Sequence, residues 1–277
     1  MLDIRATSLA PHIVHYLNAL NITAPMGSFE FVAQLQRQHL ATFSFSSINA
    51  MQGVYLSLEA EALFDRVINK RQGGYCFEHN RIMYLVLQAL GYDVRPALAR
   101  VMLNGKIDNP RTHRVTLLKF ADKTYTIEVG FGVKSPVFPI EVDQSTVFNE
   151  GRNQYQVERT TTSATVSLLA PEQLVLYQID LSEVFEGDCE VGHFYSHQHH
   201  EAAFVNHLVV SRIESGQRYL IRNNQFIHSN EHTDVEVVQT IDNVVLLRTL
   251  LDEYFAIAAS DEHLQVAFDK VRTRIAL

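Results

Sequence analysis

The segment that most constrains how this chain folds runs from two glycines through a cysteine into a long apolar stretch. After Gly73-Gly74-Tyr75-Cys76, apolar side chains fill most positions from Ile82 to Leu90, and Gly91 follows. The stretch is too long for an ordinary strand and is apolar on most sides. It therefore predicts a buried helix that ends at the glycine. Cys76 then stands at or just inside the N-terminus of a core helix.

A cysteine at the start of a helix is well placed for chemistry. The first N–H groups of a helix have no partner within it, and together with the positive end of the macrodipole they favour negative charge. These conditions favour the thiolate, the nucleophilic form of cysteine. The alternative is that Cys76 is a small apolar residue, since free cysteines are among the most buried residue types. The preceding glycines and a downstream histidine and acid favour a nucleophile.

A predicted β-hairpin supplies the candidate base and acid. His113 opens one strand, Glu128 lies near the end of the next, and Ala121-Asp122 is a tight turn between them. With that turn, His113 faces Gly130 and is a diagonal neighbour of Glu128 on one face of the sheet. A slip of one residue would send the two side chains to opposite faces. The spacing permits a histidine–carboxylate pair without requiring one.

Both residues also have simpler interpretations. His113 alone would be a strand-end histidine bonded to water, and Glu128 alone would pair with a basic neighbour such as Arg114. In the company of Cys76 they fit a nucleophile, a base and a group that orients the base. Backbone N–H groups around Gly74 and Tyr75 are the candidates to hold a developing oxyanion.

Three segments resemble the arylamine N-acetyltransferase family. Arg71 to Asn80 resembles the family pattern Arg-X-Gly-Gly-Tyr-Cys-Phe-Glu-X-Asn, and 110–118 and 125–132 resemble two further family segments. The resemblance implies a triad of Cys76, His113 and Glu128. The family usually has aspartate at the last position. Glutamate keeps the charge and adds a methylene, which affects rate and substrate range more than mechanism.

The resemblance also implies an activity and a substrate site. The activity is acetyl transfer from acetyl-CoA, the acyl donor, to the nitrogen (or oxygen) of arylamines, hydrazines or arylhydroxylamines. It follows a ping-pong mechanism through an acetyl-Cys76 thioester. No metal is implied. The expected substrate-binding residues are Phe45, Thr112 and Phe131.

Other activities remain open on the same fold. The enzyme alternatives are an amide synthase that takes a long acyl chain from a carrier protein, and a thioester hydrolase of the papain or transglutaminase type. A non-catalytic binding protein is a third possibility. It is kept open by Glu128 and by the region of Phe45, where the glutamate of the family's Pro-Phe-Glu-Asn stretch is missing.

The order of the predicted elements indicates an α+β protein. Helical periodicity predominates in residues 1–94 and alternation in 95–195, and 196–277 combines both. We expect an N-terminal helical bundle, a central antiparallel β-barrel and a C-terminal α/β lid. The family resemblance further implies a core of the cysteine-protease and transglutaminase type. Among the expected strands are Asn149–Val157 and Phe204–Ile213, and Tyr195–Glu201 is a polar junction before the lid.

The composition limits which binding partners and which cellular compartment we expect for this protein. The net charge of −8, with no basic stripe, argues against nucleic acid, although a local basic pocket for an anionic ligand is compatible with it. Two cysteines are too few for a disulfide framework. No apolar run is long enough for a bilayer, and the charged start Met1–Arg5 is not a secretory signal. We expect a cytoplasmic protein without a membrane partner; the oligomeric state is open.

Two further features carry little chemistry. Histidines gather late in the chain, but no cysteine accompanies them, their spacing fits no metal-ligand motif, and we do not expect the helix that would put His193 and His197 on one face. Cys189 stands between two acidic residues, which disfavour a thiolate, so we interpret it as structural. The histidines concerned are His193, His197, His199, His200 and His207.

Overall fold

The computed structural model describes residues 9–233 and 235–275. Its N-terminal part is a bundle of helices packed around the helix that begins at Cys76, which confirms the predicted start of that helix. None of the helices in the described ranges has the length and apolar character needed to span a bilayer. Met1–Arg5 lies outside the described residues. The N-terminal elements are α1 (Pro11–Asn18), α2 (Phe29–Thr42), η1 (Ala50–Gln52), α3 (Ala60–Phe64), η2 (Asp65–Asn69) and α4 (Cys76–Ala89).

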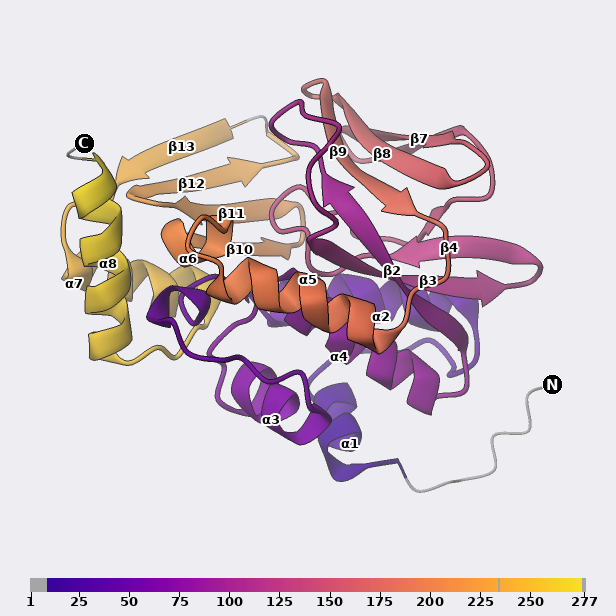
Figure 1. Cartoon of the computed structure of the whole chain (residues 1–277), viewed down its shortest axis with the longest axis horizontal. Helices are drawn as coiled ribbons and strands as arrows, with labels where there is room; N and C mark the ends of the chain where they lie inside the picture. The colour runs from indigo at the N-terminus through magenta and orange to yellow at the C-terminus, as the bar shows by residue number, and fades with distance from the viewer. Residues whose placement is uncertain (1–8, 234, 276–277) are drawn as a thin grey trace.

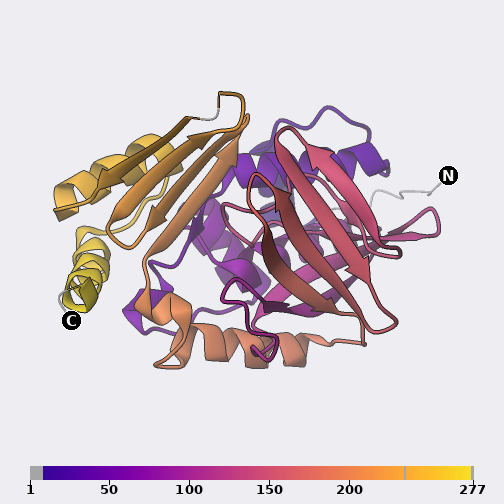
Figure 2. The same cartoon turned by 90° about the horizontal axis from the view of Figure 1, so that it is seen from above.

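The middle part of the chain forms a curved antiparallel sheet, as predicted, which lies on one side of the molecule in Figure 2. Its strand order is β5-β4-β3-β2-β9-β8-β7-β6, and its interior is filled by apolar side chains that include Tyr155 and Tyr177. The single strand predicted for Asn149–Val157 is wrong, because a turn at Gly151 divides it into two paired strands. The strands are β2 (Asp93–Val101), β3 (His113–Phe120), β4 (Lys123–Ile127), β5 (Ile140–Glu141), β6 (Thr146–Glu150), β7 (Asn153–Arg159), β8 (Ser163–Ala170) and β9 (Leu174–Asp180).

A second antiparallel sheet, in the order β1-β10-β11-β12-β13, forms the C-terminal lid. The C-terminal helices pack against this sheet on the side away from the barrel (Figure 1). The strand predicted for Phe204–Ile213 is wrong at its start, because residues 204–206 belong to a short helix and the strand begins only at Val209. The elements are β1 (Phe45–Ser46), α6 (Ala203–Asn206), β10 (Val209–Glu214), β11 (Gln217–Arg222), β12 (Gln225–Asn230), β13 (Val235–Thr240), α7 (Val244–Leu250), η3 (Leu251–Phe255) and α8 (Asp261–Ile275).

The expectation of no helix around His193 and His197 is wrong, because both belong to helix α5 (Glu186–Gln198). This helix also includes the first part of the polar junction predicted at Tyr195–Glu201, whose role as a link between domains stays a prediction. Close packing explains this helix. A Cβ at Gly192 would lie 2.8 Å from Phe77 Cζ and 3.1 Å from the Arg111 carbonyl oxygen, so only glycine allows this approach. Figure 2 shows α5 along one edge of the molecule, and the helix contacts β2 of the barrel and the short helices η1 and α6. The predicted boundary after residue 195 falls inside α5, and the division into domains 1–94, 95–195 and 196–277 stays a prediction.

Candidate active site

Cys76 is the first residue of α4 and is only 2% exposed. It belongs to an apolar cluster with Phe45, Tyr75 and Phe77. Its Sγ lies 3.7 Å from the Thr112 carbonyl oxygen, at the entrance to strand β3. The sulfur is therefore enclosed between the start of a helix and the start of a strand, where little water competes with its neighbours.

A buried carboxylate stabilises the start of α4. Glu78 Oε2 accepts a hydrogen bond from the Tyr75 N–H (3.1 Å), and Oε1 pairs with Arg66 Nη2 (2.6 Å). Burial raises the pKa of Glu78, and Arg66 opposes that rise. The carboxylate satisfies an N–H group at the helix start that otherwise has no partner. The same bond occupies the Tyr75 N–H, one of the groups predicted to hold an oxyanion together with Gly74.

The hairpin register determines where His113 and Glu128 lie. Strands β3 and β4 pair Phe120 with Lys123 and continue in that register, so Ala121-Asp122 is the two-residue turn, as predicted. Both turn residues have positive φ (49° and 62°), as the mirror-image turns of tight hairpins require. The register brings His113 Nε2 to 2.6 Å from Glu128 Oε2.

His113 is hydrogen bonded on both sides, to Glu128 and to Cys76. Because Nε2 faces Glu128, Nδ1 is the nitrogen left for the sulfur. Burial lowers the pKa of His113, but the charge of Glu128 and the bonds to Cys76 and Glu128 outweigh it and raise that pKa to about 10. The ring is therefore an imidazolium at neutral pH, and its positive charge lies beside the Cys76 sulfur.

The extra methylene of Glu128 is fully accommodated. While Oε2 faces His113, Oε1 accepts from the Gly130 N–H (2.6 Å) and from Asn80 Nδ2 (2.9 Å). Asn80 is itself fixed, since its Nδ2 also donates to the Arg114 carbonyl (2.6 Å) and its Oδ1 accepts from the Val129 N–H (3.2 Å). These bonds hold the carboxylate in one orientation, which in turn orients the imidazole.

Asn80 is the site residue that sequence reasoning missed. It stands four residues after Cys76 on α4, so both lie on the same face of the helix. A Cβ at Gly130 would lie 2.7 Å from both Asn80 Nδ2 and Cys76 Cα, so this glycine lets the loop after Glu128 reach the helix. The i, i+4 spacing of cysteine and asparagine was the signal available in the sequence.

The residues predicted to bind substrate surround this centre. The Phe131 ring lies edge-on to the His113 ring, with centroids 5.4 Å apart, and is half-buried. Thr112 contacts Cys76 through its carbonyl oxygen, whereas Phe45 is buried in the cluster around Cys76.

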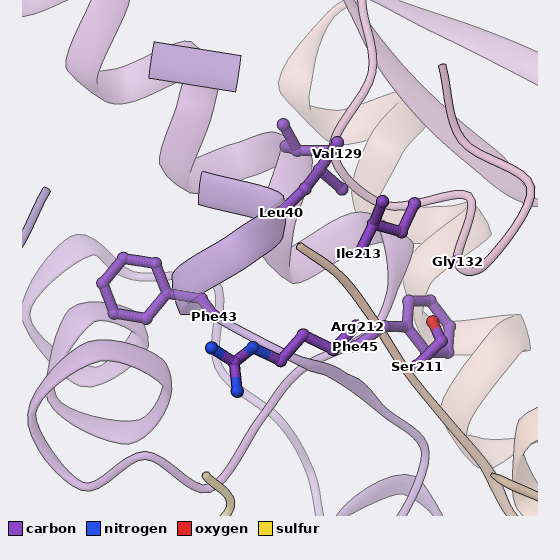
Figure 3. Close-up of a pocket in the computed structure, with 8 residues that line it drawn as sticks. All are labelled: Leu40, Phe43, Phe45, Val129, Gly132, Ser211, Arg212 and Ile213. Carbon is purple, nitrogen blue, oxygen red and sulfur yellow. The ribbon is translucent and has the colours of Figure 1, made fainter. Parts of the chain in front are cut away.

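A pocket is lined in part by Phe45 and by Val129, the residue after Glu128. None of the three predicted triad residues lines it. Figure 3 shows the pocket between α2, β10 and the loop after Glu128. Its lining residues are Leu40, Phe43, Phe45, Val129, Gly132, Ser211, Arg212 and Ile213.

Helix α5 places His193 and His197 on one face after all, with ring centroids 4.1 Å apart. Their nitrogens are nevertheless engaged by the protein. His193 bonds the Tyr75 hydroxyl through Nδ1 (2.5 Å) and the Leu56 carbonyl through Nε2 (2.5 Å). His197 bonds the His193 carbonyl (2.6 Å) and the Leu56 N–H (3.3 Å). Across residues 9–233 and 235–275, no group of three or more potential ligand side chains is placed to hold a metal ion.

The second cysteine lies in a different environment. Cys189 is fully buried in α5, and burial raises the pKa of its thiol to about 11. It therefore stays protonated at neutral pH, and Cys76 is the thiol with an imidazolium beside it.

The fold and this centre define a class of protein: one whose buried cysteine, at a helix N-terminus, contacts a histidine held by a carboxylate on an antiparallel barrel. Comparison with known proteins agrees. Residues 28–264 match the family model described as N-acetyltransferase. The arylamine N-acetyltransferase of Mycolicibacterium smegmatis is 30% identical over 219 residues, which cover 75% of this chain and 80% of that protein. The chain belongs to the arylamine N-acetyltransferase family, a family of acyltransferases.

Solved structures of the same fold support the assignment. The arylamine N-acetyltransferase from Salmonella typhimurium superposes with a TM-score of 0.87 at 22% identity, covering 94% of this chain and 99% of that one. The Mycobacterium marinum arylamine N-acetyltransferase in complex with CoA superposes with a TM-score of 0.85 at 24% identity, with the same coverage. At these identities the likeness establishes the fold.

Proposed function

We propose that this protein transfers the acetyl group of acetyl-CoA to the nitrogen (or oxygen) of arylamines, hydrazines or arylhydroxylamines through an acetyl thioester on Cys76. The observation that carries the proposal is the position of His113, whose Nε2 lies 2.6 Å from Glu128 Oε2 and whose other side faces Cys76. The pKa of His113 is raised to about 10 there, so a positive charge lies beside the proposed nucleophile at neutral pH. Membership of the family and the CoA complex of the Mycobacterium marinum relative support the choice of donor and acceptor.

In the first half-reaction, the Cys76 thiolate attacks the acetyl carbonyl carbon of acetyl-CoA. A carbon–sulfur bond forms as the carbonyl becomes a tetrahedral oxyanion, and the bond to the CoA sulfur then breaks. The leaving CoA thiolate takes the proton of His113, which becomes neutral. Glu128 keeps the proton on Nε2, so Nδ1 is the nitrogen that gives it up.

In the second half-reaction, the amine nitrogen attacks the acetyl carbon of the thioester. His113, now neutral at Nδ1, takes a proton from the nitrogen as the new bond forms. The bond between carbon and the Cys76 sulfur breaks, and the thiolate returns beside the imidazolium. The cycle needs no metal and no redox partner.

The remaining site residues receive roles by their place around the triad. We assign Phe45 and Phe131 to the acceptor pocket, since both rings lie in the shell of aromatic side chains around Cys76 and His113. Thr112, whose carbonyl contacts the sulfur, borders the same space. Gly74 and Tyr75 stay our prediction for the oxyanion, and for the Tyr75 N–H this role requires its bond to Glu78 to break.

The proposed partners are small molecules: CoA and an aromatic amine or hydrazine. We also propose a cytoplasmic location, which the two free cysteines support, since free thiols persist in a reducing compartment. The net charge of −8 supports neither nucleic acid nor an anionic membrane surface as a partner.

Steady-state kinetics test the proposal. Initial rates of amine acetylation are measured while acetyl-CoA and an arylamine are varied, and double-reciprocal plots are expected to be parallel, as a ping-pong mechanism requires. Cys76→Ser is expected to lose activity, and Cys189→Ser, the matched control, to keep it. Intersecting lines, or an active Cys76→Ser, would contradict the mechanism.

A further inference from the structure

Four groups outside the triad form a continuous line of hydrogen bonds, which we call the histidine network. The Tyr16 hydroxyl lies 2.8 Å from His39 Nδ1, His39 Nε2 lies 2.7 Å from His79 Nδ1, and His79 Nε2 lies 3.2 Å from the Ser44 carbonyl oxygen. The network links α1, α2 and α4 to the residue before β1. The four residues are buried, with at most 4% exposure.

Only one proton arrangement satisfies every bond. The Ser44 carbonyl can only accept, so His79 carries its proton on Nε2 and accepts through Nδ1. His39 must then donate through Nε2 and accept through Nδ1, and the Tyr16 hydroxyl must donate. The network therefore has a direction, from the tyrosine to the carbonyl, and both imidazoles are neutral.

The surroundings keep it neutral. Burial lowers the pKa of His39, helped by His79, and burial lowers the pKa of His79 to about 4. Burial raises the pKa of Tyr16. An aromatic ring, Phe43, packs against Tyr16 and His39. Glu128 acts on His79 through its charge alone. A neutral network with fixed donors and acceptors sets positions; it does not carry charge to the triad.

His79, which bonds the Ser44 carbonyl at the end of the histidine network, also contacts Phe45. The Phe45 ring stacks on the His79 ring, with centroids 6.4 Å apart and planes 16° apart. The backbone of Phe45 forms a bridge with Gly74, and the Ser46 N–H donates to the Gly74 carbonyl (2.6 Å). Phe45 is thus held between the pocket in Figure 3 and the glycine two residues before Cys76.

We propose that His79 is a positioning residue for the acceptor: its bond to the Ser44 carbonyl holds that carbonyl, and through it the Phe45 ring, at the distance from Cys76 that the amine needs. The proposal rests on the proposed function, since it takes Phe45 to contact the amine. It predicts that damage to the last bond of the network affects the second half-reaction and spares the first.

Two substitutions at one position separate positioning from stability. In His79→Asn, the side-chain oxygen can replace Nδ1 and accept from His39, but the bond to Ser44 is lost. In His79→Gln, the side-chain nitrogen can replace Nε2 and donate to Ser44, but the bond to His39 is lost. Each variant loses one buried hydrogen bond, so we expect similar falls in Tm.

Their kinetics are expected to differ. His79→Asn should raise the KM for the amine about tenfold, a loss typical of a misplaced contact, while the burst of CoA released in the first half-reaction keeps its wild-type rate. His79→Gln should keep the KM within about twofold. Equal KM changes in both variants, no change in either, or a slower burst in His79→Asn would overturn the proposal.

Hydrogen exchange provides a readout that does not depend on activity. The Ser46 N–H is expected to exchange faster in His79→Asn than in His79→Gln, because only the former releases the segment that this amide anchors to Gly74. Equal exchange in the two variants contradicts the proposal, even if wild type acetylates no amine. A wild type without acetyl transfer that keeps the exchange difference would refute the proposed function and leave the positioning of Phe45 supported.

Discussion

Replacing Glu128 by glutamine should change the tautomer of His113 and leave the fold intact. In the wild type, Oε1 accepts from both the Gly130 N–H and Asn80 Nδ2, while Oε2 faces His113. Two donors require an acceptor, so the amide oxygen of the new side chain should take the Oε1 position and its NH₂ group should face His113 Nε2. That nitrogen must then accept, and the proton moves to Nδ1, beside Cys76.

The size of the effect follows from the pKa of His113. The rise from 6.5 to about 10 corresponds to roughly 5 kcal/mol in favour of the imidazolium, and Glu128 supplies the larger favourable part of it. Cys76 supplies the rest and remains. Loss of the charge and of the correct tautomer together should slow acetylation of the cysteine by about 10²-fold to 10⁴-fold.

The assay is the pre-steady-state release of CoA after mixing with acetyl-CoA, near neutral pH and without amine. Glu150→Gln is the matched control, because Glu150 is a largely enclosed carboxylate that pairs with Arg218, whereas Glu128 pairs with His113. We expect Glu150→Gln to release CoA at nearly the wild-type rate. A Glu128→Gln variant that folds and releases CoA as fast as wild type would refute the role of Glu128.

Three further results are expected. Glu128→Asp should slow CoA release about 10-fold to 100-fold, since the shorter side chain cannot reach both His113 and its other donors; a wild-type rate would mean that the methylene is irrelevant. Iodoacetamide at neutral pH should label Cys76 and leave Cys189 unmodified, because burial raises the pKa of the Cys189 thiol to about 11. Peptide mass spectrometry measures the labelling, and a labelled Cys189 beside an unmodified Cys76 would contradict this prediction. For His79, burial lowers the pKa to about 4, so between that value and 6.5 the unfolded state binds more protons. Its contribution to stability is complete above pH 6.5 and falls by ~3 kcal/mol as the pH drops to about 4. Denaturation of wild type and His79→Gln at several pH values would disprove this if both lost stability equally.

The hairpin was predictable because local rules determine it. Alternation placed His113 and Glu128 on one face once the two-residue turn was chosen, and the observed register is the one that the turn implies. The start of the helix at Cys76 followed in the same way, from the glycines before it and the apolar run after it. Both features depend on residues close together in the sequence.

Helix α5 and Asn80 were missed because long-range contacts determine them. The α5 segment contains Gly192, and glycine lowers intrinsic helix propensity; the helix forms where that glycine packs against Phe77. The role of Asn80 appears only when the loop after Glu128 folds back onto α4, which joins residues 48 positions apart. Gly151, which lies in the turn between β6 and β7, was a turn signal in the sequence, but the alternating pattern around it favoured a single strand.

The central claim is that Cys76 becomes acetylated, and intact-protein mass tests it most directly. The protein is mixed with acetyl-CoA without amine and measured before and after an arylamine is added. We expect a gain of one acetyl group in wild type, none in Cys76→Ser, and loss of the gain when the amine is added. An unmodified wild type that releases no CoA would contradict the account, and other acyl thioesters would then be the donors to test.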